Sequence, residues 1–342
     1  MRRLPLFATR DVHAIGNAIV DLQVQVEHSF LRELRLEPGS MTLVDHGRQA
    51  EVLAALAGQP VNSCSGGSAA NTIAGVAELG GRASFCGKVG NDEYGSFYIE
   101  DLQRLGVAMT GNANSSAVSG GSPTGTCVVL ITPDAQRTML THLGASSQLA
   151  PDDIDGEAVA AAKWCYVEGY LLPGEPTRQA ALHAMGLAKE AGAQIALTAS
   201  DAFCVRACPA LFWELLEDSV DLFFCNEAEG RALTGLQDPL EVASHIHERA
   251  KSSVALTYGA NGSLLIHENR PYPIEGVDVH AVDTTGAGDM YAAGILFGIT
   301  RGMSWPAAGR LASHAAARIV GTLGARLPRK FTADEIRALS GA

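Results

Sequence analysis

WCYVE, at residues 164–168, is a short apolar run, and it is followed by an amphipathic segment, Thr177–Ala191, and by a second apolar run, QIALT, at residues 194–198. Apolar runs of this length predict buried strands, and the segment between them has the length and spacing of a helix. The alternation continues through a predicted helix at Ala210–Leu216, a strand at Val220–Cys225, a helix at Pro239–Lys251 and a strand at Val254–Tyr258. Strands that alternate with helices form right-handed βαβ units, so this half of the chain predicts a doubly wound α/β domain around a mainly parallel sheet.

The first 145 residues show a different order of elements. Two strands and two helices are predicted there, at Val12–Val20, Ala83–Val89, Gln49–Leu56 and Ala69–Leu79. Four further segments have extended patterns without crossover helices: Leu22–Val26, Met41–Val44, Thr126–Thr132 and Thr138–Leu143. Because such strands usually pair antiparallel, we expect a small β lid from residues 17–47 and 115–145, with Ser115–Gly125 as a flexible connection. Residues 12–327 then form one domain that includes the lid, and residues 328–342 form a C-terminal helix and tail.

The composition is that of a globular enzyme, with 47% hydrophobic and 18% charged residues and a net charge of −12. A nucleic-acid backbone would be repelled, since no run of basic residues offsets this charge. No apolar stretch reaches about 18 residues and the amino end has no apolar signal segment, so we expect a cytoplasmic protein without membrane contact. We also expect a monomer or a homodimer. The seven cysteines form no CxxC pair and the ten histidines are scattered, which favours reduced thiols and argues against a zinc site.

The segment DTTGAGD, at residues 283–289, precedes an apolar helix of small residues and carries the strongest local signal for chemistry. Gly286, Ala287 and Gly288 allow backbone N–H groups to approach an anion closely, and the positive end of the helix adds to the attraction. Asp289 lies in the first turn, where a carboxylate is placed to take a proton from an attacking hydroxyl. The alternative is that Asp289 only caps the helix, which is a common use of aspartate.

Two common phosphate-binding motifs are absent from the sequence. There is no GxxxxGK[ST] loop, and no GxGxxG follows the first strand, so neither a P-loop enzyme nor a nicotinamide-dependent dehydrogenase is indicated. A second glycine-rich segment, Gly66-Gly67-Ser68, precedes a helix, and Asn71 one turn later offers an amide to a substrate hydroxyl.

The span Gly66–Gly95 together with Asp283–Leu296 closely resembles the two signatures of the PfkB (ribokinase-like) kinases of carbohydrates and nucleosides. The resemblance runs from about Val12 to Leu327. It implies a ribokinase-like fold and an ATP-dependent kinase that uses Mg²⁺. Because Asp289 is intact, a non-catalytic sugar or nucleotide sensor is disfavoured.

The resemblance also implies roles for residues on both sides of the transferred phosphate. Asn17 and Asp21 match the amide and the acid that hold sugar hydroxyls, and Glu229 matches the acid that organises Mg²⁺ through water. The other substrate-site matches are Gly66, Gly67, Ser68 and Asn71. The other nucleotide-site matches are Asn226, Thr257, Gly259, Gly262 and His314, with Asp283 and Thr285 at a K⁺ site. Taken alone, Asn226–Glu229 would equally start a helix, and Thr257–Gly262 would equally form a hairpin turn.

Three features favour a nucleoside, adenosine first, over a free hexose, ketosugar or ribose. Asn17 with Asp21 resembles the adenosine-kinase form of the motif, in which the carboxylate accepts hydrogen bonds from both ribose hydroxyls. Thr124–Cys127 resembles the lid strand of adenosine kinases, and Tyr170 stands where these enzymes carry an aromatic that stacks on the base. Period-two alternation places three residues on one face of the next lid strand: Met139, Thr141 and Leu143. Packing is the alternative role for Tyr170 and for these lid residues.

The resemblance implies one direct phosphoryl transfer. Asp289 deprotonates the 5′-hydroxyl, which attacks the γ-phosphate of ATP in line. Charge on the transferring group is met by the backbone N–H groups of residues 287–289, by Mg²⁺ and by Arg137 from the lid.

Overall fold

The structure is a computed structural model, and it describes residues 8–111, 117–118 and 121–341. Part of the predicted connection Ser115–Gly125 lies outside these residues. Within them, the main sheet has nine strands in the order β16-β15-β14-β13-β12-β11-β1-β5-β7. Their bounds are β16 Arg270–Ile274, β15 Ser263–His267, β14 Ser253–Thr257, β13 Leu222–Asn226, β12 Gln194–Thr198, β11 Ala162–Glu168, β1 Arg10–Ile15, β5 Ala83–Cys86 and β7 Ala108–Thr110. The strands from β14 to β7 are parallel, and β15 and β16 are antiparallel additions at one edge.

Hydrophobic side chains alternate between two cores, one on each face of this sheet. In β11, Trp164 and Tyr166 belong to one core, whereas Cys165 and Val167 belong to the other. Burial on both faces explains why residues 164–167 form a continuous apolar run instead of alternating with polar residues. The predicted doubly wound α/β fold is confirmed.

Helices cover both faces of the sheet. The first face carries α3 (Ser68–Glu78), α4 (Glu93–Leu105), α11 (Ala287–Thr300), α12 (Trp305–Val320) and α13 (Ala333–Ser340). The second carries α5 (Gly156–Ala160), α6 (Thr177–Ala191), α7 (Ala202–Ala207), α8 (Pro209–Asp218), α9 (Glu227–Thr234) and α10 (Pro239–Ala250). Because α13 packs within the first core, the division at residue 328 stays a prediction.

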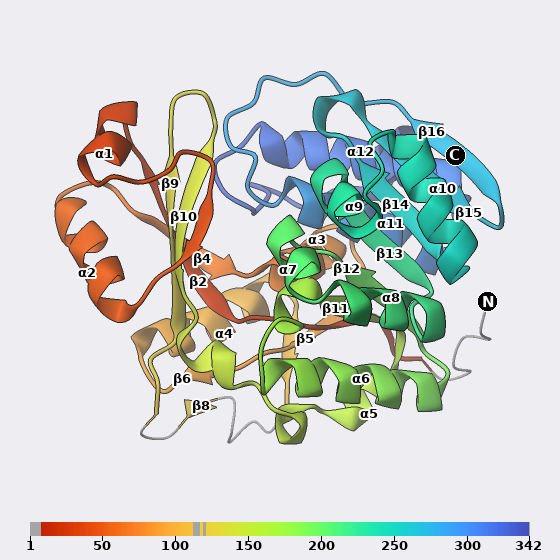
Figure 1. Cartoon of the computed structure of the whole chain (residues 1–342), viewed down its shortest axis with the longest axis horizontal. Coiled ribbons are helices and arrows are strands. Elements are labelled where there is room, and N and C mark those ends of the chain that lie inside the picture. Colours follow the sequence, from red (N-terminus) through yellow and green to blue (C-terminus); the bar gives the residue numbers. More distant parts are fainter. Residues whose placement is uncertain (1–7, 112–116, 119–120, 342) are drawn as a thin grey trace.

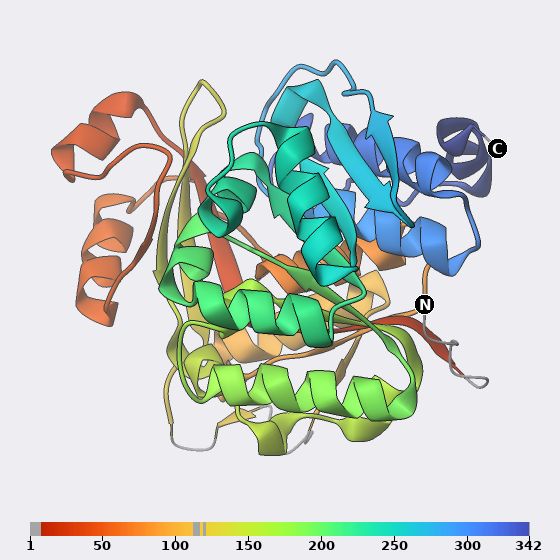
Figure 2. The same cartoon turned by 45° about the vertical axis from the view of Figure 1, so that its right-hand side comes forward.

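A second sheet of five strands forms the lid, in the order β3-β10-β9-β2-β4 among the residues described. The strands are β3 (Met41–Leu43), β10 (Arg137–His142), β9 (Gly125–Ile131), β2 (Ile19–Gln25) and β4 (Asn62–Gly66). Two helices, α1 (His28–Glu33) and α2 (His46–Ala55), cover its outer face, where Leu31, Val52 and Leu56 join the first core. Figures 1 and 2 show α1 and α2 on the side of the lid strands that faces away from the main body.

Two expectations about the lid are wrong. The predicted single strand Val12–Val20 is broken after Ile15, and its second half enters the lid as β2. The expected antiparallel pairing holds for β9 with β10 and for β2 with β4, but β2 pairs parallel with β9, and β3 pairs parallel with β10. The chain passes through the main domain between β2 and β9, so no hairpin forces them to run in opposite directions. In the part of the chain that the structure describes, no helix has both the length and the apolar character needed to cross a bilayer.

Candidate active site

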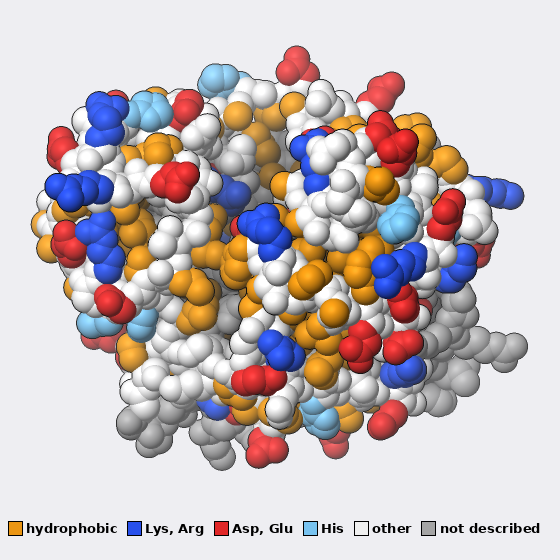
Figure 3. Space-filling model, in the orientation of Figure 1, with side chains coloured by type: hydrophobic (Ala, Val, Ile, Leu, Met, Phe, Trp, Pro, Cys, Tyr) orange, Lys and Arg blue, Asp and Glu red, His pale blue; other side chains and the backbone are white. Residues whose placement is uncertain are grey.

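A cleft with a cavity of about 810 Å³ lies between the lid and the carboxyl ends of the main strands. Its floor includes the ends of β11, β12, β13 and β14 and the amino end of α11. The lid contributes residues of β2, β3, β9 and β10. Figure 3 shows the surface hollowed between the lid and the main body, with hydrophobic side chains in the hollow. Ligands of open parallel sheets bind at the carboxyl ends of the strands, so this cleft has the expected position of an active site.

Asp289 occupies the first turn of α11 and points toward α3. Its Oδ1 accepts a hydrogen bond from Ser68 Oγ at 2.7 Å, and its Oδ2 accepts one from Asn71 Nδ2 at 2.9 Å. Burial raises the pKa of this carboxyl above its ordinary value, although the two hydrogen bonds and the charges of Arg137 and Arg326 oppose the rise. Asp289 therefore does not cap its own helix, and its carboxylate is oriented toward the cleft as a base would be.

The start of α11 is shaped for an anion. Gly286 adopts a left-handed φ of 75°, and a Cβ there would lie 2.6 Å from the Cβ of Ala325. A Cβ on Gly288 would meet no atom within 4 Å, so the backbone there is open to the cleft. The Ala287 N–H donates to the Thr284 carbonyl at 3.3 Å, whereas Gly288 and Asp289 lie in the first turn, where a helix offers its N–H groups no acceptor. These two N–H groups are the suitable donors to a phosphoryl oxygen.

Asp21 lies on β2 with its carboxylate in the cleft and only 7% of the residue exposed. Burial raises its pKa to about 7, against the opposing charges of Arg326 and Arg137. Among the described residues, none donates a hydrogen bond to this carboxylate, so its oxygens are available to a ligand. Gly66 does not line the cleft, but a Cβ there would lie 2.2 Å from Asp21 Cγ, so the glycine makes room for the acid.

Asn17 lines the cleft, but much of its amide is engaged within the protein. Its Nδ2 donates to Glu168 Oε1 at 2.7 Å, and its Oδ1 accepts from Ser146 Oγ at 3.1 Å. Glu168 also accepts from the backbone N–H of Asn17 and of Ala69, and burial raises its pKa to about 7. The sequence prediction missed Glu168, although a polar residue at the carboxyl end of an apolar strand was a usable signal.

Arg326 is the second residue that the sequence prediction missed. Its Nη1 donates to Asn71 Oδ1 at 2.6 Å, and its Nη2 donates to the backbone carbonyl of Ser65. Arg326 lies in the segment after α12, and no sequence motif distinguishes it from the neighbouring arginines. Its role depends on contacts with residues about 255 positions away, which a single sequence does not reveal.

Asn226 and Glu229 line the cleft and also form a capping box at the start of α9. Asn226 Nδ2 donates to Glu229 Oε1 at 2.8 Å, and the Asn226 N–H donates to Oε2 at 2.8 Å. Burial and the charges of Asp201 and Asp289 raise the pKa of Glu229 to about 7. Helix capping, the simpler role considered for this pair, is thus present, and the cleft position is compatible with a further role toward a metal-bound phosphate.

The nucleotide-side predictions separate into residues in the cleft and residues outside it. Thr257, Gly259 and Thr285 line the cleft. Gly262, with a left-handed φ of 102°, forms the turn between β14 and β15, where a Cβ would lie 2.1 Å from the carbonyl oxygen of Ile274. His314 lies within α12 and is not among the described residues that line the cleft, so its contact with ATP stays a prediction.

The predicted K⁺ residues are tied to each other. Asp283 is fully buried, and its Oδ1 accepts from Thr285 N at 2.8 Å and from Thr285 Oγ1 at 2.6 Å. Its Oδ2 accepts from Gly324 N at 2.8 Å. The carboxylate thus joins the start of the segment at residues 283–289 to the loop after α12, and its role toward K⁺ stays a prediction.

The lid presents an apolar wall to the cleft. Ile19, Cys127 and Val129 form a small hydrophobic cluster, against which Met139 and Leu143 pack. The cleft also contains Thr141, whose Oγ1 lies 3.3 Å from Cys127 Sγ, and Arg137. From the main body, Tyr170 lines the cleft beside Phe203, with ring centroids 5.9 Å apart.

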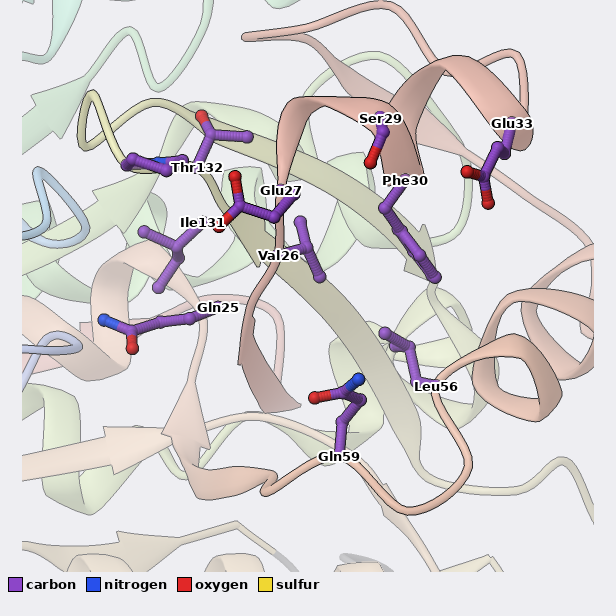
Figure 4. Close-up of a pocket in the computed structure, with 11 residues that line it drawn as sticks. Gln25, Val26, Glu27, Ser29, Phe30, Glu33, Leu56, Gln59, Ile131 and Thr132 are labelled. Atoms are coloured by element: carbon purple, nitrogen blue, oxygen red, sulfur yellow. The ribbon is translucent and has the colours of Figure 1, made fainter.

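A smaller cavity of about 550 Å³ lies beside α1, with Val26, Phe30, Leu56 and Ile131 in its lining (Figure 4). None of the residues predicted for the site lines it. The larger cleft therefore gathers the chemistry.

Comparison with known proteins agrees with this geometry. Residues 42–331 match the family described as pfkB family carbohydrate kinase. The crystal structure of adenosine kinase from Sinorhizobium meliloti is 36% identical, covers 98% of this chain and 100% of its own chain, and superposes with a TM-score of 0.88. The fructokinase of Escherichia coli is 26% identical over 69% of this chain and 77% of its own length. The aminoimidazole riboside kinase of Salmonella typhimurium is 26% identical over 87% of this chain and 83% of its own length. The chain belongs to the pfkB family, and it is an ATP-dependent sugar or nucleoside kinase.

Proposed function

We propose that the protein phosphorylates the 5′-hydroxymethyl group of a nucleoside and converts adenosine to AMP. The observation that carries the proposal is the pairing of one buried acid with two apolar walls in the same cleft. Asp21 offers unengaged carboxylate oxygens, while the lid cluster and the Tyr170–Phe203 pair offer apolar surface. A nucleoside has the matching parts, a vicinal diol and a flat base.

The apolar walls distinguish a nucleoside from a free sugar. A hexose or ketosugar has hydroxyls on every side, and burying a hydroxyl against Ile19, Val129 and Met139 without a partner costs free energy. A base stacked beside Tyr170 instead contributes about 1–3 kcal/mol. The adenosine kinase of S. meliloti supports this choice, and the names of the fructokinase and riboside kinase relatives define the alternatives.

Asp289 would act as the general base. Ser68 and Asn71 fix both carboxylate oxygens, and each oxygen keeps a lone pair for the 5′-hydroxyl proton. A raised pKa makes the carboxylate a stronger base than an exposed aspartate. The N–H groups of Gly288 and Asp289 would stabilise charge on the transferring phosphoryl, with Arg137 approaching from the lid.

The residues fit a Mg²⁺ ion held mainly by the phosphates of ATP. No group of three or more acidic, histidine or cysteine side chains converges on one point among the described residues, so the protein does not offer a full metal cage. Both Glu229 oxygens already accept hydrogen bonds from Asn226. Asn226 and Glu229 would therefore contact the ion through its water molecules rather than directly. The ion, when bound, neutralises phosphate charge as the transition state forms.

A panel of acceptors tests the proposal. ADP release is measured with adenosine, other nucleosides, ribose and fructose, and the adenosine product is identified by chromatography. We expect AMP, and a kcat/KM for adenosine more than about tenfold above that for any free sugar, because stacking of about 1–3 kcal/mol is lost without a base. A free sugar that exceeds every nucleoside would overturn the nucleoside proposal and leave the kinase assignment intact.

A further inference from the structure

Arg326 connects three parts of the molecule behind the proposed base. Its Nη1 donates to Asn71 Oδ1 at 2.6 Å, on α3. Its Nη2 donates to the backbone carbonyl of Ser65, on β4, and lies 3.2 Å from Ser65 Oγ. Two residues earlier, Gly324 is held by Asp283. Hydrogen bonds to α3 and β4 therefore fix the guanidinium group, and the contact of Gly324 with Asp283 fixes the loop that carries it.

Arg326 and Asp289 together fix which way the Asn71 amide faces. An asparagine side chain can present either its oxygen or its nitrogen in one direction, whereas a guanidinium can only donate hydrogen bonds. Arg326 therefore requires the Asn71 oxygen, which leaves the Nδ2 group to donate to Asp289 Oδ2 at 2.9 Å. In the opposite orientation, Asn71 would present an N–H to the arginine and an oxygen to the carboxylate, and both contacts would be repulsive.

The charge of Arg326 reaches the same carboxylate. The charges of Arg326 and Arg137 both oppose the rise in pKa of Asp289 and of Asp21. Arg137 lies on a lid strand, whereas Arg326 is bound to α3 next to the base. The charge of Asp289 in turn helps to raise the pKa of four neighbouring groups: Asp21, Tyr166, Glu168 and Glu229. Three of these four are carboxyl groups, so the two arginines carry the compensating charge.

We propose that Arg326 is a positioning residue for phosphoryl transfer: it orients the Asn71 amide, and through it holds Asp289 in the ionised, correctly turned form that takes the proton. The inference rests on the proposed role of Asp289 as the base, but not on the identity of the acceptor. Without Arg326, the Asn71 oxygen loses its donor, and Asp289 loses one of the two cations whose charges oppose its rise in pKa.

The test compares Arg326→Met with Arg326→Lys and with a control, Arg329→Met. Arg329 is 61% exposed and pairs with Glu335, so its variant removes one positive charge from the same loop without touching Asn71. Activity is followed from pH 5 to 9 with whichever acceptor the wild type phosphorylates fastest. We expect kcat of Arg326→Met to fall by about 10–100-fold at pH 7, since small misplacements of a reacting group have effects of this size.

The pH profile separates positioning from a structural defect. Asp289 must be ionised to act, and loss of a nearby cation raises the pKa of a carboxyl, so the acid limb of kcat should move about one pH unit upward in Arg326→Met. Arg326→Lys should keep the limb near its wild-type place and recover part of kcat. Arg329→Met should match the wild type in both. Reading kcat rather than kcat/KM keeps the titration of Asp21 in the free enzyme out of the comparison.

A double variant tests whether Arg326 acts through Asn71. If it does, adding Arg326→Met to Asn71→Leu should cost much less than Arg326→Met alone, because the amide that it orients is already gone. Equal losses at every pH with an unmoved limb, or additive losses in the double variant, would overturn the proposal. If Arg326→Met does not fold, the acid limbs of Arg326→Lys and Asn71→Leu are compared instead. An upward shift in Asn71→Leu that is absent in Arg326→Lys supports the proposal, and an unmoved limb in both variants overturns it. Full activity of Asp289→Asn would instead show that the proposed base itself is wrong. If the wild type prefers sugars to nucleosides, only the proposed acceptor is wrong, and the test of Arg326 is unaffected.

Discussion

Replacing Asp21 by asparagine keeps the shape of the side chain and removes its charge, and it should weaken substrate capture while stabilising the fold above neutral pH. The pKa of the buried carboxyl is about 7, compared with an ordinary value of 3.8. Because the folded protein has the higher pKa, it binds this proton more tightly than the unfolded chain does. The stability that Asp21 contributes is therefore greatest below the ordinary pKa and is lost as the pH rises through 7.

The size of the stability effect follows from the pKa difference. Between pH 5 and pH 7 the wild type loses up to about 3 kcal/mol from this one group, at about 1.4 kcal/mol per pH unit, and Asp21→Asn does not. An unfolding entropy of about 2.1 cal/mol/K for each of 342 residues converts this free energy into about 4 °C of Tm. Glu168 and Glu229, also with pKa values of about 7, titrate in both proteins, so the difference in Tm between the two isolates Asp21.

Thermal unfolding and kinetics check the two halves of this prediction. The Tm of Asp21→Asn minus that of the wild type should be up to about 4 °C larger at pH 8 than at pH 5. At pH 8, kcat/KM for the nucleoside should fall by about 10–100-fold, since a hydrogen bond to a charged group contributes about 1.5–3 kcal/mol. Asp134→Asn, which removes a lid carboxylate that is 47% exposed, is the control and should change neither quantity. A Tm difference that is the same at both pH values, with kcat/KM within about threefold of wild type, would refute the reasoning.

Three further substitutions test the other parts of the cleft. Asp289→Asn should reduce turnover by about 10²–10⁴-fold while ATP binding, measured by calorimetry, stays within a few-fold, because the amide keeps the shape but cannot take the proton; activity within about threefold would remove Asp289 as the base. Glu229→Gln should raise the Mg²⁺ concentration needed for half-maximal rate more than it changes acceptor KM, because the carboxylate acts on water around the ion; the opposite pattern would move Glu229 away from the metal. Tyr170→Ala should cost adenosine about 1–3 kcal/mol in kcat/KM and leave free sugars nearly unchanged; an equal loss for both acceptors would show that Tyr170 is a packing residue.

The parallel sheet and the position of the cleft could be predicted because both depend on local patterns. Strands buried on both faces are mainly apolar, as in residues 164–167, and the DTTGAGD segment marks the amino end of α11. Asp289 and Asn71, singled out from glycine-rich segments before helices, line one cavity, and so does Asp21, which the family resemblance indicated.

Other features depend on contacts between distant parts of the chain. The parallel pairing of β2 with β9 joins Ile19 to Gly125, with elements of both the lid and the main domain between them in the chain. The engagement of Asn17 by Glu168 spans 151 residues, and the contact of Arg326 with Asn71 spans 255. Neither contact leaves a periodic or compositional trace, so a single sequence has no signal for either.

The helices α1 and α2 give the lid sheet a cover of its own on the side away from the cleft. A two-sided sheet with one bare hydrophobic face would have to borrow that cover from a second copy of the chain, and two lids joined in this way would have to move together. Here α1 and α2 supply that cover within one chain, so this face of the lid needs no second copy to bury it. Acceptor saturation curves should accordingly be hyperbolic, with a Hill coefficient near 1 that does not change with enzyme concentration.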